Sequence, residues 1–142
     1  MNILKILTPK RKTGNLGEDA AVKFLKKNGY KILERNYVAN GYEIDIIAQK
    51  DEITAFVEVK TRNVRNLGTK EARPASSVTP EKQRKIISAA SYYRGCVRLE
   101  GRMRFDVIEV YVETVIEGTV VKDIKHLTNT FDKNTAYDHK FY

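Results

Sequence analysis

The sequence predicts a single α/β domain in which a central mixed β-sheet is flanked by helices, in the order αβββαββ. Three observations support this class: two segments with helical apolar spacing, five segments rich in branched and aromatic residues, and turn signals between them. The length of 142 residues, with 42% hydrophobic and 31% charged residues, suits one domain with one substantial core. No internal repeat or dividing linker is evident.

The first helix follows a basic segment. The expected organisation is a basic N-terminal arm at residues 1–13, a domain at residues 14–128, and a tail without assigned structure at residues 129–142. The helix is expected to begin near Asn15 and to end at Asn28-Gly29. Glu18 follows Asn15 by three residues, as in a capping box. Its side chain lies beside the apolar face of the helix, so a second interpretation is an acid that leans toward the sheet.

Three strands are expected next, one at residues 30–38 and two within residues 42–60. An Asn-Gly pair separates the first strand from the second. Asp51-Glu52 lies between two runs of branched and aromatic residues, which indicates a tight hairpin. An even-length loop there places Asp45 opposite Glu58, whereas a one-residue slip would send one strand's charged side chains to the other face.

The acids of this hairpin are expected to meet on one face. Alternation along each strand puts Glu43 with Asp45, and Glu58 with Lys60. The residues expected on the opposite faces are Ile44, Ile46, Val57 and Val59. Opposed carboxylates repel each other, and a divalent cation neutralises them better than Lys60 alone. From these residues alone, the alternative is a solvated face with a few salt bridges.

The remaining elements are a long polar loop at residues 61–78, a second helix and two strands. Thr79 is expected to cap the helix, with Pro80 at its first position and Gly95 at its end. The core stripe of this helix is expected to comprise Ile86, Ile87, Ala90 and Tyr93. The last strands are expected at residues 103–112 and 115–124, around a Glu113-Thr114 turn.

The net charge of +8 indicates a polyanionic partner, with nucleic acid ahead of a membrane surface or an acidic protein. Basic residues follow the acidic hairpin in the sequence, so a positive rim around an acidic centre is expected. The candidates for nucleic-acid contact are Arg62, Arg65, Lys70, Arg73, Lys82, Arg84 and Lys85.

Three features predict a cytoplasmic protein that does not enter a membrane. No apolar run approaches the roughly 20 residues needed to span a bilayer. The first apolar stretch is too short and too interrupted for a signal peptide. Cys96 is the only cysteine, which excludes an internal disulfide and a thiolate metal cluster.

Several chemistries lack the residues they need. The chain has no tryptophan on which a sugar could stack, and His126 and His139 lie outside any motif for a serine or cysteine nucleophile. No phosphate-binding glycine loop appears. Carboxylates gathered within a basic surface fit phosphodiester hydrolysis best, in which Mg²⁺ or Mn²⁺ polarises the phosphate and activates water.

Several blocks of the sequence resemble a known group of nucleases. Asp45, followed thirteen residues later by Glu58-Val59-Lys60, resembles the D…(D/E)-x-K motif of the restriction-endonuclease-like nucleases. The closer similarity is to the small bacterial YraN-like family, which is similar in outline to archaeal Holliday junction resolvases. The blocks that carry it are G-N-L-G-E-D-A-A at 14–21, G-Y-K-I-L-E-R-N at 29–36, E-I-D-I-I-A at 43–48, F-V-E-V-K-T-R at 56–62 and R-F-D-V at 104–107.

The resemblance implies a restriction-endonuclease-like fold and a metal-dependent endonuclease acting on DNA rather than RNA, including branched or structured DNA. It implies that Asp45 and Glu58 bind the metal with help from the Val59 carbonyl. Lys60 would orient or activate the attacking water, and Glu18 would complete the site from the first helix.

Three further points concern the neighbourhood of this motif. The resemblance gives Glu43 no fixed role, and Gln83 is a weaker candidate neighbour. In the YraN-like family the E-I-D block usually follows Gly directly, whereas here Tyr42 holds that position. This departure affects the entry into the strand and leaves the acids intact.

Two other functional classes stay open. One is a non-catalytic nucleic-acid-binding module on a nuclease scaffold, and the other is an interaction protein that uses the basic arm and loop. The acids Glu18, Asp45 and Glu58 beside Lys60 favour the enzyme, because a binding module gains nothing from acids next to phosphates. A nuclease that cuts both strands of a junction would often be a dimer, so a homodimer is included among the expected partners.

Overall fold

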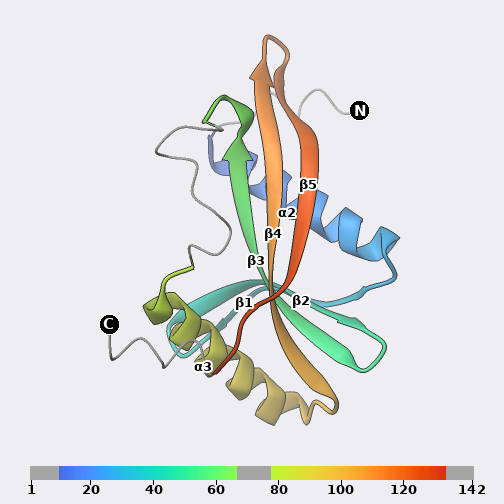
Figure 1. Cartoon of the computed structure of the whole chain (residues 1–142), viewed down its shortest axis with the longest axis vertical. Helices are drawn as coiled ribbons and strands as arrows, with labels where there is room; N and C mark the ends of the chain where they lie inside the picture. Colours follow the sequence, from blue (N-terminus) through green and yellow to red (C-terminus); the bar gives the residue numbers. More distant parts are fainter. Residues whose placement is uncertain (1–9, 67–77, 134–142) are drawn as a thin grey trace.

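The computed structural model describes residues 10–66 and 78–133. Its elements are α2 (Lys10–Lys27), β1 (Lys31–Ala39), β2 (Tyr42–Lys50), β3 (Ile53–Asn63), the 3-10 helix η1 (Val64–Asn66), α3 (Pro80–Val97), β4 (Arg102–Val115) and β5 (Gly118–Phe131). The strands form one sheet in the order β1-β2-β3-β4-β5, with β3 and β4 parallel and the other neighbours antiparallel (Figure 1). The predicted α/β class and the order αβββαββ are confirmed, and the arrangement is consistent with a restriction-endonuclease-like fold.

The predicted hairpin between β2 and β3 is confirmed. Lys50 pairs with Ile53, so Asp51-Glu52 forms a two-residue turn. Asp51 adopts a left-handed backbone conformation with φ 55°, as the tight turns of β-hairpins require. The loop is therefore of even length, as predicted.

The first helix begins earlier than predicted. α2 starts at Lys10, so residues 10–13 belong to the helix and not to an N-terminal arm. Asn15 and Glu18 consequently lie inside the helix, and the predicted capping box is wrong. The basic residues before Asn15 are good helix formers, which explains why the helix can extend into them.

The second helix begins as predicted and ends later. The Thr79 side chain accepts a 3.2 Å hydrogen bond from the N–H of Lys82, and Pro80 is the first helical residue. Gly95 does not end the helix, which continues to Val97. Arg98 provides the left-handed C-cap, with φ 52°.

The last hairpin is longer than predicted. Val115 pairs with Gly118, which places the turn at Ile116-Glu117 rather than at Glu113-Thr114. β5 reaches Phe131 and so includes the first residues of the predicted tail. β3 likewise takes the start of the predicted loop, while residues 67–77 and 134–142 lie outside the described residues.

The two helices pack on the sheet through separate apolar clusters. One cluster joins α3 to the sheet through residues such as Ile47, Phe56 and Phe105. The other joins α2 to the sheet through residues such as Ala48, Val57 and Ile108. The predicted core stripe of α3 is buried. Within residues 10–66 and 78–133, no helix is both long and apolar enough to cross a membrane.

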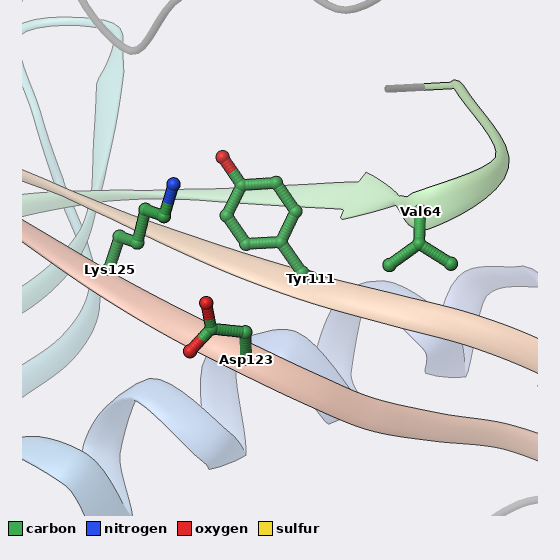
Figure 2. Close-up of a pocket in the computed structure, with 4 residues that line it drawn as sticks. All are labelled: Val64, Tyr111, Asp123 and Lys125. Carbon is green, nitrogen blue, oxygen red and sulfur yellow. The ribbon is translucent and has the colours of Figure 1, made fainter. Parts of the chain in front are cut away.

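The sheet extends beyond the area that α3 covers. α3 packs on β1 and β2, whereas β3, β4 and β5 continue past it (Figure 1). In this extension Tyr111 of β4 pairs with Arg62 of β3 and with Asp123 of β5. Tyr111 and Lys125 project from the side of the sheet away from α2 (Figure 2). This half of the face is therefore open in the part of the chain that the structure describes.

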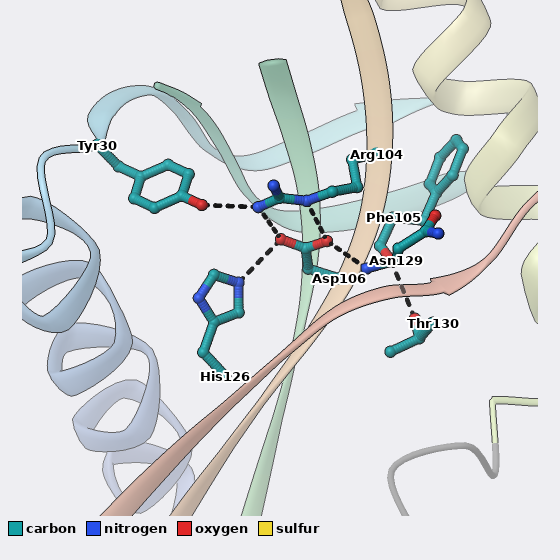
Figure 3. A network of polar contacts seen from close by, with 7 residues as sticks. All are labelled: Tyr30, Arg104, Phe105, Asp106, His126, Asn129 and Thr130. Atoms are coloured by element: carbon teal, nitrogen blue, oxygen red, sulfur yellow. Dashed lines mark hydrogen bonds and ion pairs between the residues drawn. The ribbon is translucent and has the colours of Figure 1, made fainter. Parts of the chain in front are cut away.

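A buried carboxylate, Asp106, links β4 to β5 and to the start of β1 (Figure 3). Arg104 donates hydrogen bonds of 2.9 and 2.7 Å to its two oxygens, and Arg104 also donates to the Tyr30 hydroxyl at 2.7 Å. His126 Nε2 lies 2.8 Å from Asp106 Oδ2, and the N–H of Asn129 donates to Oδ1 at 3.0 Å. Burial alone would raise the pKa of Asp106, but these bonds outweigh it and hold the pKa below its ordinary value.

The N-cap of α3 supplies a first stability prediction. Thr79→Ala removes the acceptor for the Lys82 N–H, and we expect a loss of about 1 kcal/mol in the free energy of unfolding. Thr79→Asn retains an acceptor and should stay close to wild type. Urea denaturation measures both variants, and an alanine variant as stable as wild type would contradict the cap's contribution.

The Asp106 network supplies a second stability prediction. Arg104→Met keeps the bulk of the side chain but leaves a buried carboxylate with fewer donors, so we expect a loss of about 3 kcal/mol at neutral pH. The loss should shrink below the ordinary aspartate pKa near 4, because Asp106 is then protonated in the variant. Arg102→Met changes an exposed arginine of the same strand and serves as the control. A loss independent of pH would count against the ionic explanation.

Candidate functional site

β2 is distorted at Asp45. The ladder with β3 ends at the pair Ile46–Val57, and the ladder with β1 passes from Arg35–Ile46 to Tyr37–Ile44 without an Asn36–Asp45 pair. Asn36 has a left-handed φ of 54°, a conformation that asparagine adopts more readily than most residues. Asp45 therefore lies where β2 leaves β3 and where one pair of its ladder with β1 is missing.

This distortion corrects two predictions about faces and pairs. Ile44 packs in the α3 cluster and Ile46 in the α2 cluster, so they do not share a face as strict alternation predicted. The ladder also stops before the predicted Asp45–Glu58 and Glu43–Lys60 pairs. The even-length turn is correct, but the two strands separate just before they reach the acids.

A side-chain hydrogen bond replaces the missing ladder contact. Asp45 Oδ2 accepts a 2.8 Å bond from the N–H of Val59, the residue next to Glu58. Burial raises the pKa of Asp45 to about 7, against the Val59 hydrogen bond, and the negative charges of three acids add to the rise. These acids are Glu58, Glu18 and Glu43. The charges of the other predicted acids thus reach Asp45.

Glu58 is held from two sides. The Tyr42 hydroxyl donates to Glu58 Oε2 at 3.2 Å, and Lys60 Nζ lies 3.8 Å from Glu58 Oε1. Burial, followed by the charge of Glu58, raises the pKa of Tyr42, so its hydroxyl stays a donor. The predicted shared face of Glu58 and Lys60 agrees with this ion pair. The role of Tyr42 was not predicted from the sequence, where it appeared only as a departure from the usual glycine.

Glu18 reaches the site from α2. Its Oε1 accepts bonds from Arg35 Nε at 3.1 Å and from Asn36 Nδ2 at 3.0 Å. Arg35 also binds Asp19, at 2.7 Å. Of the two interpretations of Glu18, capping is thus excluded and the acid near the sheet is supported. The sequence offered only one weak signal that Asn36 would bind Glu18: asparagine tolerates a left-handed backbone, which permits an irregularity in the strand at this position.

The predicted nucleic-acid contacts fall into separate groups. Arg62 Nε donates to Glu109 at 3.3 Å, and an Arg65 nitrogen donates to the Thr114 carbonyl at 3.3 Å. At the start of α3, Lys85 pairs with Glu81 at 3.4 Å. Of the other predicted residues, Lys82 is exposed, Arg84 is half-buried, and Lys70 and Arg73 lie outside the described residues.

Gln83 of α3 is buried rather than exposed toward solvent. Its amide nitrogen donates to the Val78 carbonyl at 2.8 Å. Its Oε1 has no hydrogen-bond partner among the described residues. These contacts tie Gln83 to the start of its own helix, and none of them joins it to the acids.

The donor set suits a hard cation, but the side chains are turned toward protein partners. Carboxylate and carbonyl oxygens are the ligands that Mg²⁺ and Mn²⁺ prefer. Among the described residues, no group of three or more acidic, histidine or cysteine side chains is already arranged around a metal position. Asp45, Glu58 and Glu18 instead meet the donors described above. In this arrangement the three carboxylates do not share one ion position.

Comparisons with known proteins place these residues within one family model. The model described as "Uncharacterised protein family UPF0102" matches residues 17–110, which include Glu18, Asp45, Glu58 and Lys60. A UPF0102 protein of Clostridium perfringens strain 13 is 51% identical over 98 residues, covering 68% of this chain and 77% of that protein. A UPF0102 protein of Caldicellulosiruptor saccharolyticus is 42% identical over 123 residues, covering 86% and 98%. One of Desulfosudis oleivorans is 39% identical over 132 residues, covering 92% and 98%.

The raised pKa of Asp45 predicts a pH-dependent stability. A carboxyl with a pKa of about 7 in the folded protein and 3.8 as its ordinary value destabilises the fold as the pH rises between these values. Asp45→Asn removes this penalty, so we expect the variant to exceed wild type by on the order of 1–3 kcal/mol above pH 7. The difference should disappear near pH 4.

Urea denaturation in EDTA at several pH values measures this difference. Asp19→Asn is the matched control, because Asp19 is a half-exposed acid of the same helix as Glu18. It should show no gain at high pH. An Asp45→Asn variant that is no more stable than wild type at pH 8 would contradict the electrostatic penalty.

Proposed function

The chain belongs to the uncharacterised protein family UPF0102, and from its site we propose that it is a metal-dependent endonuclease. Its substrate would be DNA, including branched or structured DNA, and its location the cytoplasm. One observation carries the proposal: the charges of Glu58 and Glu18 act on the Asp45 carboxyl at the point where β2 leaves β3, and Lys60 pairs with Glu58. The net charge of +8 supports a polyanionic substrate.

The electrostatic cost of the acidic cluster supports a bound cation. Burial, with neighbouring negative charges adding to it, raises the pKa of Asp45 to about 7, so the ionised carboxyl is unfavourable without a counter-charge. A destabilising arrangement of this kind is typical of functional sites. A divalent cation on the carboxylates would relieve the repulsion and keep Asp45 ionised at neutral pH.

The roles follow from the positions of the residues. Asp45 and Glu58 would hold Mg²⁺ or Mn²⁺ with the Val59 carbonyl, and Glu18 would complete the site directly or through water. When bound, such an ion polarises the phosphate and lowers the pKa of a bound water.

Two side chains near Glu58 act on the reaction in different ways. The ammonium of Lys60, 3.8 Å from Glu58, would orient the attacking water and stabilise the charge that develops on the phosphate. The Tyr42 hydroxyl would keep the Glu58 carboxylate in position.

A second candidate is a non-catalytic nucleic-acid-binding module. It is favoured by the hydrogen bonds that already satisfy each carboxylate, including those of Arg35 and Asn36 to Glu18. In that case the acids would only hold the strands together, and the basic residues would bind phosphates without metal.

A cleavage experiment separates the two candidates. Plasmid, linear duplex and four-way-junction DNA are incubated with Mg²⁺, with Mn²⁺ and with EDTA, and sedimentation gives the oligomeric state. We expect metal-dependent cleavage that Asp45→Asn and Lys60→Ala each reduce about 100-fold or more. Asp19→Asn should cleave like wild type.

Circular dichroism confirms that each variant is folded. Binding that persists without cleavage across all substrates and metals would overturn the enzyme in favour of the binding module. Binding that does not weaken with salt would count against phosphate contacts in either candidate.

A further inference from the structure

The open face of β3, β4 and β5 carries a pocket that the proposed cleavage does not use. Val64, Tyr111, Asp123 and Lys125 line it (Figure 2). Its volume is about 140 Å³. That is below the roughly 300–1,000 Å³ of sites that enclose a whole small molecule, so the pocket suits one flat ring better than a complete ligand.

The ring of Tyr111 is held at its edge and remains accessible from its face. Its hydroxyl donates to Glu109 Oε1 at 3.0 Å, and Arg62 binds the other oxygen of the same carboxylate at 3.3 Å. Lys125 Nζ lies 5.3 Å from the ring centroid and belongs to an exposed side chain. The ring is thus fixed in place. The group over its face is the ammonium of Lys125, whose long, exposed side chain can adopt other rotamers.

The register of β3 and β4 places the pocket close to the proposed cleavage site. In the parallel ladder Lys60 pairs with Glu109 and Arg62 pairs with Tyr111. Two residues of a strand span roughly 7 Å. Tyr111 therefore lies about one or two nucleotides away from a phosphate at Lys60.

The charges around the ring select the portion of a nucleotide that can enter. Asp123 and Lys125 both line the pocket, and Glu109 is paired with Arg62. The charges around the ring therefore about balance and give a bare phosphate no net attraction. A neutral aromatic base needs no counter-charge, and its amino groups could donate to Asp123. Lys125 would then pair with a flanking phosphate. A base reaches such a pocket only when it is unpaired and turned out of a duplex.

We propose that the Tyr111 pocket binds an unpaired base of the strand that continues from the cleavage site. The path of the strand rests on the proposed nuclease function. Stacking on an aromatic side chain is sequence-tolerant, so the pocket recognises the single-stranded character of the substrate rather than a sequence.

A fluorescence experiment tests the stacking directly. The chain has no tryptophan, so Tyr111→Trp introduces a single reporter at the pocket. In EDTA, we expect quenching on adding a DNA hairpin with a single-stranded extension and little change with a blunt duplex. Tyr92→Trp is the control, because Tyr92 is a 53% exposed tyrosine on α3 and should not respond.

Affinity measurements separate stacking from the structural role of the hydroxyl. Tyr111→Ala should weaken binding of the extended hairpin by about 5- to 150-fold, with little effect on the blunt duplex. Tyr111→Phe keeps the ring but loses the bond to Glu109, so it should bind like wild type. A phenylalanine variant as weak as the alanine variant would overturn stacking in favour of a structural role.

The outcomes distinguish this inference from the proposed function. Metal-dependent cleavage by wild type, together with no quenching in Tyr111→Trp and no effect of Tyr111→Ala, overturns the pocket and leaves the nuclease. Quenching by extended DNA without cleavage supports the pocket and overturns the nuclease. The absence of any DNA binding overturns both.

Discussion

The hydrogen bond from the Val59 N–H to Asp45 Oδ2 is the contact on which the site depends. It takes the place of a backbone pair at the point where β2 leaves β3. A backbone donor in the middle of a sheet must find an acceptor, and a carboxylate is a strong one. Where the strands separate, the Val59 N–H loses its backbone acceptor, and the Asp45 carboxylate replaces that acceptor.

This arrangement collects negative charge that the surrounding residues only partly neutralise. Arg35 and Asn36 satisfy Glu18, while Tyr42 and Lys60 satisfy Glu58. Asp45 receives only a neutral backbone donor, and burial together with the neighbouring acids raises its pKa. The unbalanced charge lies on Asp45, which is where a cation would stabilise the cluster most.

Sequence patterns predicted what depends on local chemistry. The Asp51-Glu52 turn and the Thr79 cap follow from residue types whose backbone preferences are strong, and both are confirmed. The face inversion at Ile44 and Ile46 was missed, because it lies opposite an irregularity in another strand, the left-handed Asn36, which the pattern of β2 does not show. The last turn was misplaced because isoleucine is typical of strands, yet Ile116 lies at the tip of the hairpin and is 99% exposed.

The parallel pairing of β3 with β4 sets the spacing between the acids and the open sheet face. Because Lys60 is opposite Glu109 and Arg62 is opposite Tyr111, backbone hydrogen bonds fix the spacing of the backbone positions from which Lys60 and Tyr111 project. The Glu109 carboxylate then joins the two strands through Arg62 and Tyr111. A strand of nucleic acid that follows β3 would meet first a group suited to a phosphate and then a ring suited to a base. The order of these groups is set by the register between β3 and β4. These strands are far apart in the sequence, so the order cannot be predicted from either segment alone.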